Sequence, residues 1–114
     1  MRSEESVHVA VADALRAYGV DFFHPPNESK AHVSKRVRLR KMGLSKGVPD
    51  IVIVTPPPCG GYVAAALEIK SDTGRPTPEQ KEWIERMRAH GWAAAIAKGL
   101  DACLQQLRDW GYLR

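Results

Sequence analysis

Carboxylates at two places in the middle of the chain have the spacing needed to bind a divalent metal ion. Asp50 precedes an apolar run at residues 51–54, and Glu68 and Lys70 end a second run at residues 62–70. Side chains alternate faces along a strand, so Glu68 and Lys70 point the same way. If the two runs pair, Asp50 lies near Glu68. Two carboxylates beside one ammonium suit Mg²⁺, which prefers oxygen ligands and retains several waters.

The segment between the two apolar runs favours a reversal of the chain. Three prolines at residues 56–58 end the first run, because proline cannot donate a backbone hydrogen bond. Gly60 and Gly61 then supply the conformational freedom for a turn. We therefore expect a β-hairpin that brings the carboxylates together.

The order of these residues resembles a known nuclease motif. Pro49-Asp50 followed by Glu68-Ile69-Lys70 resembles the core of the PD-(D/E)XK nuclease superfamily. The longer pattern, Lys46-Gly47-Val48-Pro49-Asp50, then Glu68-Ile69-Lys70 and Thr77-Pro78-Glu79-Gln80, is similar to the virus-type replication-repair nuclease (VRR-NUC) family. This resemblance covers nearly the whole chain. It implies an α/β, restriction-endonuclease-like core in the order α-β-β-β-α-β-α, and a metal-dependent DNA endonuclease.

The resemblance also implies a role for each motif residue. Asp50 and Glu68 would hold Mg²⁺, or Mn²⁺ in its place, together with the backbone carbonyl of Ile69. Lys70 would orient or deprotonate the attacking water and neutralise charge on the phosphate. Gln80 would lie near the active site. Its position at the start of a predicted helix, three residues after Thr77, is explained equally well by a capping box.

A third acid is a candidate on the first predicted helix. Glu4 precedes Val7 by three residues and Val11 by seven, so it shares their buried stripe, whereas Glu5 points away. Acids in a first turn also favour the helix dipole, which explains either residue without a functional role. The resemblance favours Glu4 as a catalytic residue and a possible metal ligand. His8 lies one position off the stripe, and we expect it at the surface.

Positive charge is concentrated in one segment, residues 29–46. Seven bases occur there without an intervening acid, and the rest of the chain has ten bases and thirteen acids. They are Lys30, Lys35, Arg36, Arg38, Arg40, Lys41 and Lys46. The last six are predicted to contact nucleic acid. We expect a partly mobile connection, helical at most over residues 34–42, that orders on nucleic acid; a solvated loop without a partner is the alternative.

The remaining elements follow from periodicity and turn residues. Helices are expected at residues 3–18 and 77–90 and from residue 100 onward, and strands at residues 20–24 and 92–97. Asn27-Glu28 is interpreted as a turn at a strand exit. We expect one domain over residues 1–114.

Composition excludes several classes of protein. No apolar run approaches the ~20 residues that a membrane span requires, and no signal-peptide pattern is present. Cys59 and Cys103 fit no metal-binding spacing and are expected to be free thiols in a reducing cytoplasm. The resemblance to the VRR-NUC family implies that this is the cytoplasm of a bacterium or of a phage-infected cell. Neither a Ser/His/Asp nucleophile system nor a glycine-rich nucleotide loop is evident, so no organic cofactor and no membrane partner are expected.

The resemblance implies a substrate and an assembly. Stand-alone members of the family typically act as homodimers on branched DNA, including four-way junctions. Two alternatives remain: a restriction-type endonuclease that reads a short sequence, and a DNA-binding module without catalysis. The presence of Asp50, Glu68 and Lys70 argues against the second, because binding alone does not require a metal site.

Overall fold

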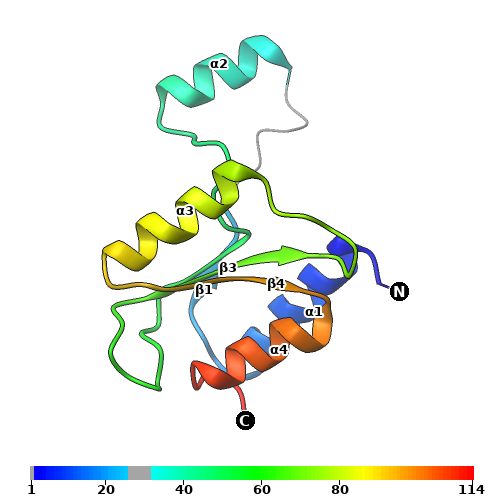
Figure 1. Cartoon of the computed structure of the whole chain (residues 1–114), viewed down its shortest axis with the longest axis vertical. Helices are drawn as coiled ribbons and strands as arrows, with labels where there is room; N and C mark the ends of the chain where they lie inside the picture. The colour runs from blue at the N-terminus through cyan, green and yellow to red at the C-terminus, as the bar shows by residue number, and fades with distance from the viewer. Residues whose placement is uncertain (1, 26–31) are drawn as a thin grey trace.

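A four-stranded mixed sheet forms the centre of the protein (Figure 1). The computed structural model describes residues 2–25 and 32–114. Its strands lie side by side in sequence order: β1 (Phe22–Phe23), β2 (Ile51–Ile53), β3 (Ala65–Lys70) and β4 (Ala93–Lys98). The pairs β1–β2 and β2–β3 are antiparallel, and β3–β4 is parallel.

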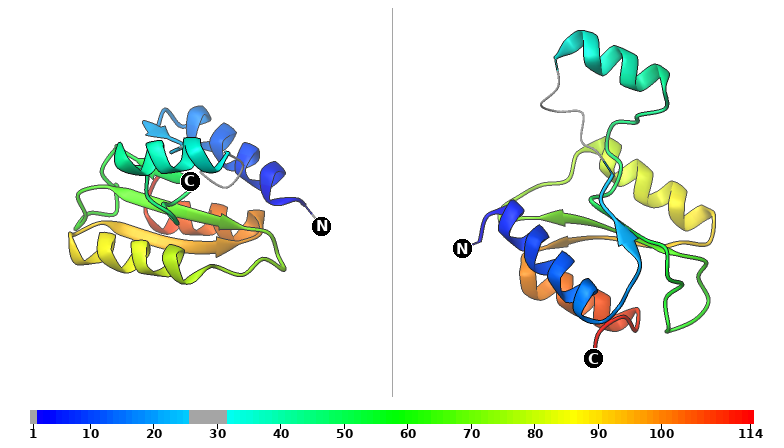
Figure 2. Two further views of the ribbon diagram at one scale, coloured as in Figure 1. Left: turned by 90° about the horizontal axis from the view of Figure 1, so that it is seen from above. Right: turned by 180° about the vertical axis from the view of Figure 1, so that it is seen from behind.

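Helices cover both faces of this sheet, as the two further views in Figure 2 show. One face carries α1 (Glu4–Ala17) and α4 (Leu100–Asp109), and the other carries α3 (Pro78–Ala89). The remaining helix, α2 (Val33–Lys41), projects away from the sheet and has no buried residue. The α/β class and the restriction-endonuclease-like core are therefore confirmed, and α2 is an addition to the expected order of elements.

Alternation along β3 decides which side chains meet which helices. Ala65, Leu67 and Ile69 lie in the main core with α1 and α4. Ala66 lies on the opposite face and packs with Ile84 of α3. Glu68 and Lys70 follow Ala66 at intervals of two residues, so the strand directs both toward α3.

The predicted hairpin is confirmed. Ile51 is paired with Leu67 and Ile53 with Ala65, in an antiparallel register. The second strand is shorter than expected, because it begins at Ala65, and Tyr62 and Val63 are exposed. The register places the residue before β2 next to the end of β3, which is the arrangement needed to join the two carboxylates.

The basic segment is more regular than expected. Nine of its residues form α2, in which basic side chains on all sides leave no apolar stripe to bury. Lys30, Asn27 and Glu28 lie outside the described residues. Both cysteines are free, Cys59 exposed and Cys103 buried. Across residues 2–25 and 32–114, every helix is too short or too polar to span a lipid bilayer.

Candidate active site

Asp50 joins the start of β2 to the end of β3. Its Oδ2 accepts a hydrogen bond from the Ile69 backbone N–H at 2.8 Å. Strand β2 begins at Ile51, so its ladder stops before Ile69, and a side-chain oxygen takes the place of a backbone acceptor. The N–H and C=O of one strand residue point to the same side, so the Ile69 carbonyl also faces the edge where Asp50 lies. The structure thus brings both predicted ligand groups to one place.

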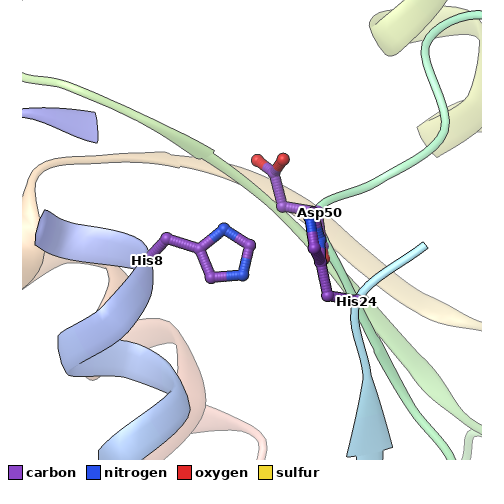
Figure 3. Close-up of side chains that lie close together, drawn as sticks. All are labelled: His8, His24 and Asp50. Atoms are coloured by element: carbon purple, nitrogen blue, oxygen red, sulfur yellow. The ribbon is translucent and has the colours of Figure 1, made fainter. Parts of the chain in front are cut away.

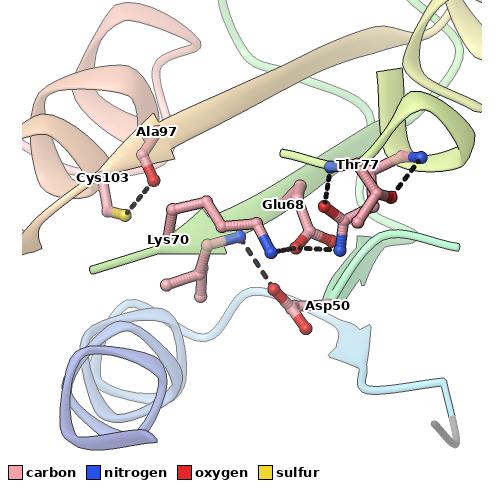
Figure 4. A network of polar contacts seen from close by, with 8 residues as sticks. Asp50, Glu68, Lys70, Thr77, Ala97 and Cys103 are labelled. Carbon is pink, nitrogen blue, oxygen red and sulfur yellow. Dashed lines mark hydrogen bonds and ion pairs between the residues drawn. The ribbon is translucent and has the colours of Figure 1, made fainter. Parts of the chain in front are cut away.

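Glu68 and Lys70 form a buried ion pair on the α3 face. The Lys70 Nζ lies 3.3 Å from Glu68 Oε2, and the residues are 8% and 2% exposed, respectively. The same Oε2 accepts a hydrogen bond from Gln80 Nε2 at 3.1 Å. Figure 4 shows Glu68, Lys70 and Asp50 within this polar network. Burying two charges is costly unless each has partners, so this pair is unusual for a purely structural position.

The second carboxylate oxygen of Glu68 lacks such a partner. Among the described residues, Oε1 is the buried side-chain oxygen without a hydrogen bond. Burial, followed by the nearby Asp50 carboxylate, raises the pKa of Glu68 to about 8, although Lys70 acts in the opposite direction. A buried, unpartnered oxygen beside a second carboxylate is the environment that a bound cation would satisfy. The donor set therefore fits a divalent metal ion.

Glu4 completes the cluster of carboxylates. One carboxylate oxygen from each of Glu4, Asp50 and Glu68 lies within 4.8 Å of the other two. Oxygen donors of this kind suit Mg²⁺ or Mn²⁺. Glu5, its neighbour in the sequence, is exposed and is not part of the cluster. The position of Glu4 on the buried stripe of α1, which Glu5 does not share, thus separated the two acids correctly.

Gln80 fulfils both of the interpretations that the sequence left open. The Gln80 side-chain Oε1 accepts a hydrogen bond from the Thr77 backbone N–H at 2.9 Å. The Gln80 backbone N–H donates to Thr77 Oγ1 at 3.2 Å, and the two bonds form a complete capping box. Its Nε2 then remains to donate to Glu68. The cap fixes the amide, and the fixed amide orients the carboxylate.

A cleft of about 390 Å³ contains all of these side chains. Glu4, Asp50, Glu68, Lys70 and Gln80 line it, together with basic residues that come from α2 and the loop after it. Arg36, Arg40 and Lys46 are the predicted nucleic-acid contacts that line the cleft, whereas Lys35, Arg38 and Lys41 do not. Arg36 and Arg40 are four residues apart and therefore share one face of α2.

The loop before Asp50 is docked on the first two turns of α3. The Lys46 carbonyl accepts a hydrogen bond from Trp83 Nε1 at 3.1 Å, and Lys46 Nζ lies 3.5 Å from Glu79 Oε1. Gly47 follows with φ +83°, and a Cβ there would lie 2.7 Å from the Glu79 backbone carbon. Only glycine tolerates both the conformation and the close approach. These contacts hold the loop that carries Asp50 against the helix that carries Gln80.

Two histidines beside the site were missed by the sequence analysis. His8, expected at the surface, is half-buried, and its ring meets the His24 ring edge-on at 4.5 Å between centroids. His8 lies four residues after Glu4, and this helical spacing was the available signal that it faces the same region. His24 follows β1, and its proximity depends on the pairing of β1 with β2, which local sequence does not specify.

Comparison with known proteins agrees with this geometry. A family model described as the VRR-NUC domain matches residues 4–101. A solved structure named as a VRR-NUC domain protein is 27% identical, with a TM-score of 0.81, covering 99% of this chain and 91% of that chain. A second, named as a VRR-NUC domain, shares the fold with a TM-score of 0.65 at 17% identity, covering 95% and 97% of the two chains. No curated protein matches the sequence. The chain belongs to the VRR-NUC domain family, a family of nuclease-type DNA-processing domains.

Proposed function

We propose that this protein is a metal-dependent DNA endonuclease that hydrolyses phosphodiesters and selects branched DNA, such as four-way junctions. The observation that carries the proposal is the convergence of Glu4, Asp50 and Glu68 within 4.8 Å of one another. The buried Lys70 ammonium lies 3.3 Å from Glu68 in the same cleft. A purely structural hairpin has no need for three converging carboxylates, one of which has a buried oxygen without a hydrogen bond.

The residues that would hold the cation are Asp50, Glu68, the Ile69 carbonyl and Glu4, the last directly or through water. Bound there, Mg²⁺ or Mn²⁺ would stabilise the negative charge that develops on the phosphate oxygens. Gln80 keeps Glu68 Oε2 in place through its hydrogen bond. Lys70, held against the same oxygen, is positioned to orient the attacking water as an ammonium, or to take a proton from that water as a neutral amine.

The walls of the cleft support a nucleic-acid substrate. Arg36 and Arg40 of α2 line it together with the carboxylates, and Lys46 lies in the loop that leads to Asp50. Guanidinium groups bind phosphate oxygens in a bidentate manner, and such contacts position a duplex without reading its bases. Recognition through the phosphate backbone of the DNA favours a substrate that is distinguished by its shape. As a homodimer, the protein would place two such sites on a symmetric junction for paired cuts.

The test is a cleavage assay on a linear duplex, a flap and a four-way junction, each with and without Mg²⁺. We expect metal-dependent cleavage that is fastest on the junction. Sequence-dependent cuts at fixed positions in the linear duplex would favour a restriction-type enzyme. Binding of all three DNAs without cleavage would mean a DNA-binding module. Light scattering of the protein alone and with junction DNA tests the dimer.

A further inference from the structure

A second group of potential metal ligands adjoins the carboxylate cluster. His8 of α1, His24 after β1 and Asp50 each offer one ligand atom within 4.8 Å of those of the other two. Figure 3 shows the two imidazole rings beside Asp50, one on α1 and the other on the chain that leaves β1. Two nitrogen donors and one carboxylate form a different donor set from the three carboxylates of the candidate active site.

The ring of His24 is held in the form that coordinates metals. Its Nδ1 lies 2.6 Å from the Asp50 backbone carbonyl. A carbonyl oxygen can only accept, so Nδ1 carries a proton, and in the neutral ring the lone pair lies on Nε2. Metal-binding histidines commonly donate their other ring N–H to a backbone carbonyl, which fixes the tautomer and the ring orientation. That support comes from the same residue that supplies the carboxylate.

The surroundings of His8 suit a ligand as well. Burial and the neighbouring His24 lower the pKa of His8, whereas the charges of Asp50 and Glu4 raise it to a smaller extent. A metal binds the neutral form of an imidazole, which a lowered pKa favours. The nearby acids also provide the negative charge that a divalent cation requires. His24 lines both the active-site cleft and the adjoining hollow that His8 lines, so an ion has a route to the cluster.

We propose that His8, His24 and Asp50 form a second cation site, which binds a borderline transition-metal ion such as Zn²⁺. Imidazole nitrogens suit Zn²⁺, Co²⁺ and Ni²⁺, whereas Mg²⁺ prefers oxygen donors, so the two clusters differ in the metals that they select. Asp50 belongs to both and couples them. The second site depends on the described side chains alone and would exist even if the protein had no nuclease activity.

The test is calorimetric titration of the full chain with Zn²⁺. H8Q and H24Q should each weaken Zn²⁺ binding by more than about tenfold, because even outer-shell changes cost that much in metal sites. H90Q is the matched control, since His90 is exposed at the end of α3, and it should leave Zn²⁺ affinity unchanged. E68Q, which alters only the carboxylate cluster, should retain most of the Zn²⁺ affinity. Circular dichroism establishes that each variant is folded.

Two results would overturn the second site. One is unchanged Zn²⁺ affinity in folded H8Q and H24Q. The other is loss of Zn²⁺ binding in E68Q alone, which would place the ion among the carboxylates and leave the proposed nuclease standing. Conversely, histidine-dependent Zn²⁺ binding without DNA cleavage would contradict the nuclease and support this site. Ring-nitrogen NMR of the wild-type protein needs no variant: Zn²⁺ should shift His8 and His24 and spare His90.

Discussion

Asp50 and Ile69 are linked across the hairpin by a hydrogen bond of 2.8 Å from the Ile69 amide to the Asp50 carboxylate. One oxygen of Asp50 therefore completes the sheet, and the other remains available to the cleft. The structural and chemical tasks of this residue are divided between its two oxygens. An amide side chain would preserve the first task and remove the second.

Replacing Asp50 with Asn should consequently separate stability from catalysis. We expect D50N to remain folded, because the Asn carbonyl oxygen can still accept the Ile69 N–H. Cleavage should fall on the order of a thousandfold, the equivalent of several kcal/mol of lost charge stabilisation in the transition state. Single-turnover cleavage in Mg²⁺ and thermal unfolding measure the two effects. D101N, at an exposed acid on α4, is the control; near wild-type cleavage by D50N would contradict its assignment as a ligand.

Glu4 and Glu5 provide a matched pair on one helix. Both are exposed acids in the first turn of α1, so each contributes similarly to the helix dipole. Only Glu4 approaches Asp50 and Glu68. E4Q should reduce cleavage at least tenfold more than E5Q, at equal stability, in a steady-state assay with varied Mg²⁺. Small and equal effects of the two changes would leave Glu4 as a helix-dipole acid.

Gln80 can be tested by keeping one of its contacts and removing the other. Q80A loses the capping box and the hydrogen bond to Glu68, and should lower the free energy of unfolding by about 1 kcal/mol. Q80E can still accept the Thr77 N–H but cannot donate to Glu68. Measured in urea at pH 5, where Glu68 is protonated, Q80E should therefore be more stable than Q80A. Both should cleave slowly; restored cleavage in Q80E would mean that Gln80 acts only as a cap.

The raised pKa of Glu68 predicts a pH dependence of stability in metal-free protein. Because the pKa is about 8 in the folded state and ordinarily 4.5, the folded protein binds this proton more tightly than the unfolded chain. Glu68 then contributes stability that is fully present below pH 4.5 and is lost as pH rises through 8. One pKa unit corresponds to about 1.4 kcal/mol, so the loss amounts to a few kcal/mol.

Urea unfolding in EDTA at pH 5 and pH 8.5 measures this loss. Wild-type protein should lose more stability than E68Q, whose neutral amide cannot ionise. Addition of Mg²⁺ at pH 8.5 should restore the stability of wild-type protein and not that of E68Q, because a bound cation favours the ionised carboxylate. Equal pH dependence of the two proteins would show that Glu68 ionises normally.

The two faces of α2 should differ in their contribution to DNA binding. Arg36 and Arg40 line the cleft, whereas Lys35 and Arg38 do not. R36Q/R40Q should lower the slope of log K against log salt by up to about 2, at roughly 0.9 per phosphate contact. K35Q/R38Q removes the same charge from another face and should lower the slope by less than half as much. Binding is measured in the D50N background, so that cleavage does not interfere. Equal effects would mean that α2 acts only through its total charge.

Local sequence was sufficient for the hairpin and for the groups that it brings together. Alternation fixed the common face of Glu68 and Lys70, and the Pro/Gly turn fixed the pairing that places Asp50 beside Glu68. Helical spacing likewise separated Glu4 from Glu5. These relationships depend on periodicities of two and 3.6 residues, which a single sequence displays directly.

Contacts between segments that are distant in the chain could not be predicted from the sequence as readily. His24 reaches Asp50 because the two-residue strand β1 pairs with β2, and so short a strand has little sequence signal. The helicity of α2 was left open because its bases are distributed around the axis and bury nothing. The division of α2 into a cleft-lining face and another face depends on how the helix is placed, which its own residues do not encode.

The residues of the candidate site come from elements that are far apart in the chain. Helix α1 supplies Glu4, the loop before β2 supplies Asp50, and α3 supplies Gln80. None of these elements carries more than part of the constellation. Contacts between residues so distant in sequence form only as the whole domain folds. In a chain still being synthesised, the candidate site therefore remains incomplete until α3 has packed on the sheet and placed Gln80 beside Glu68.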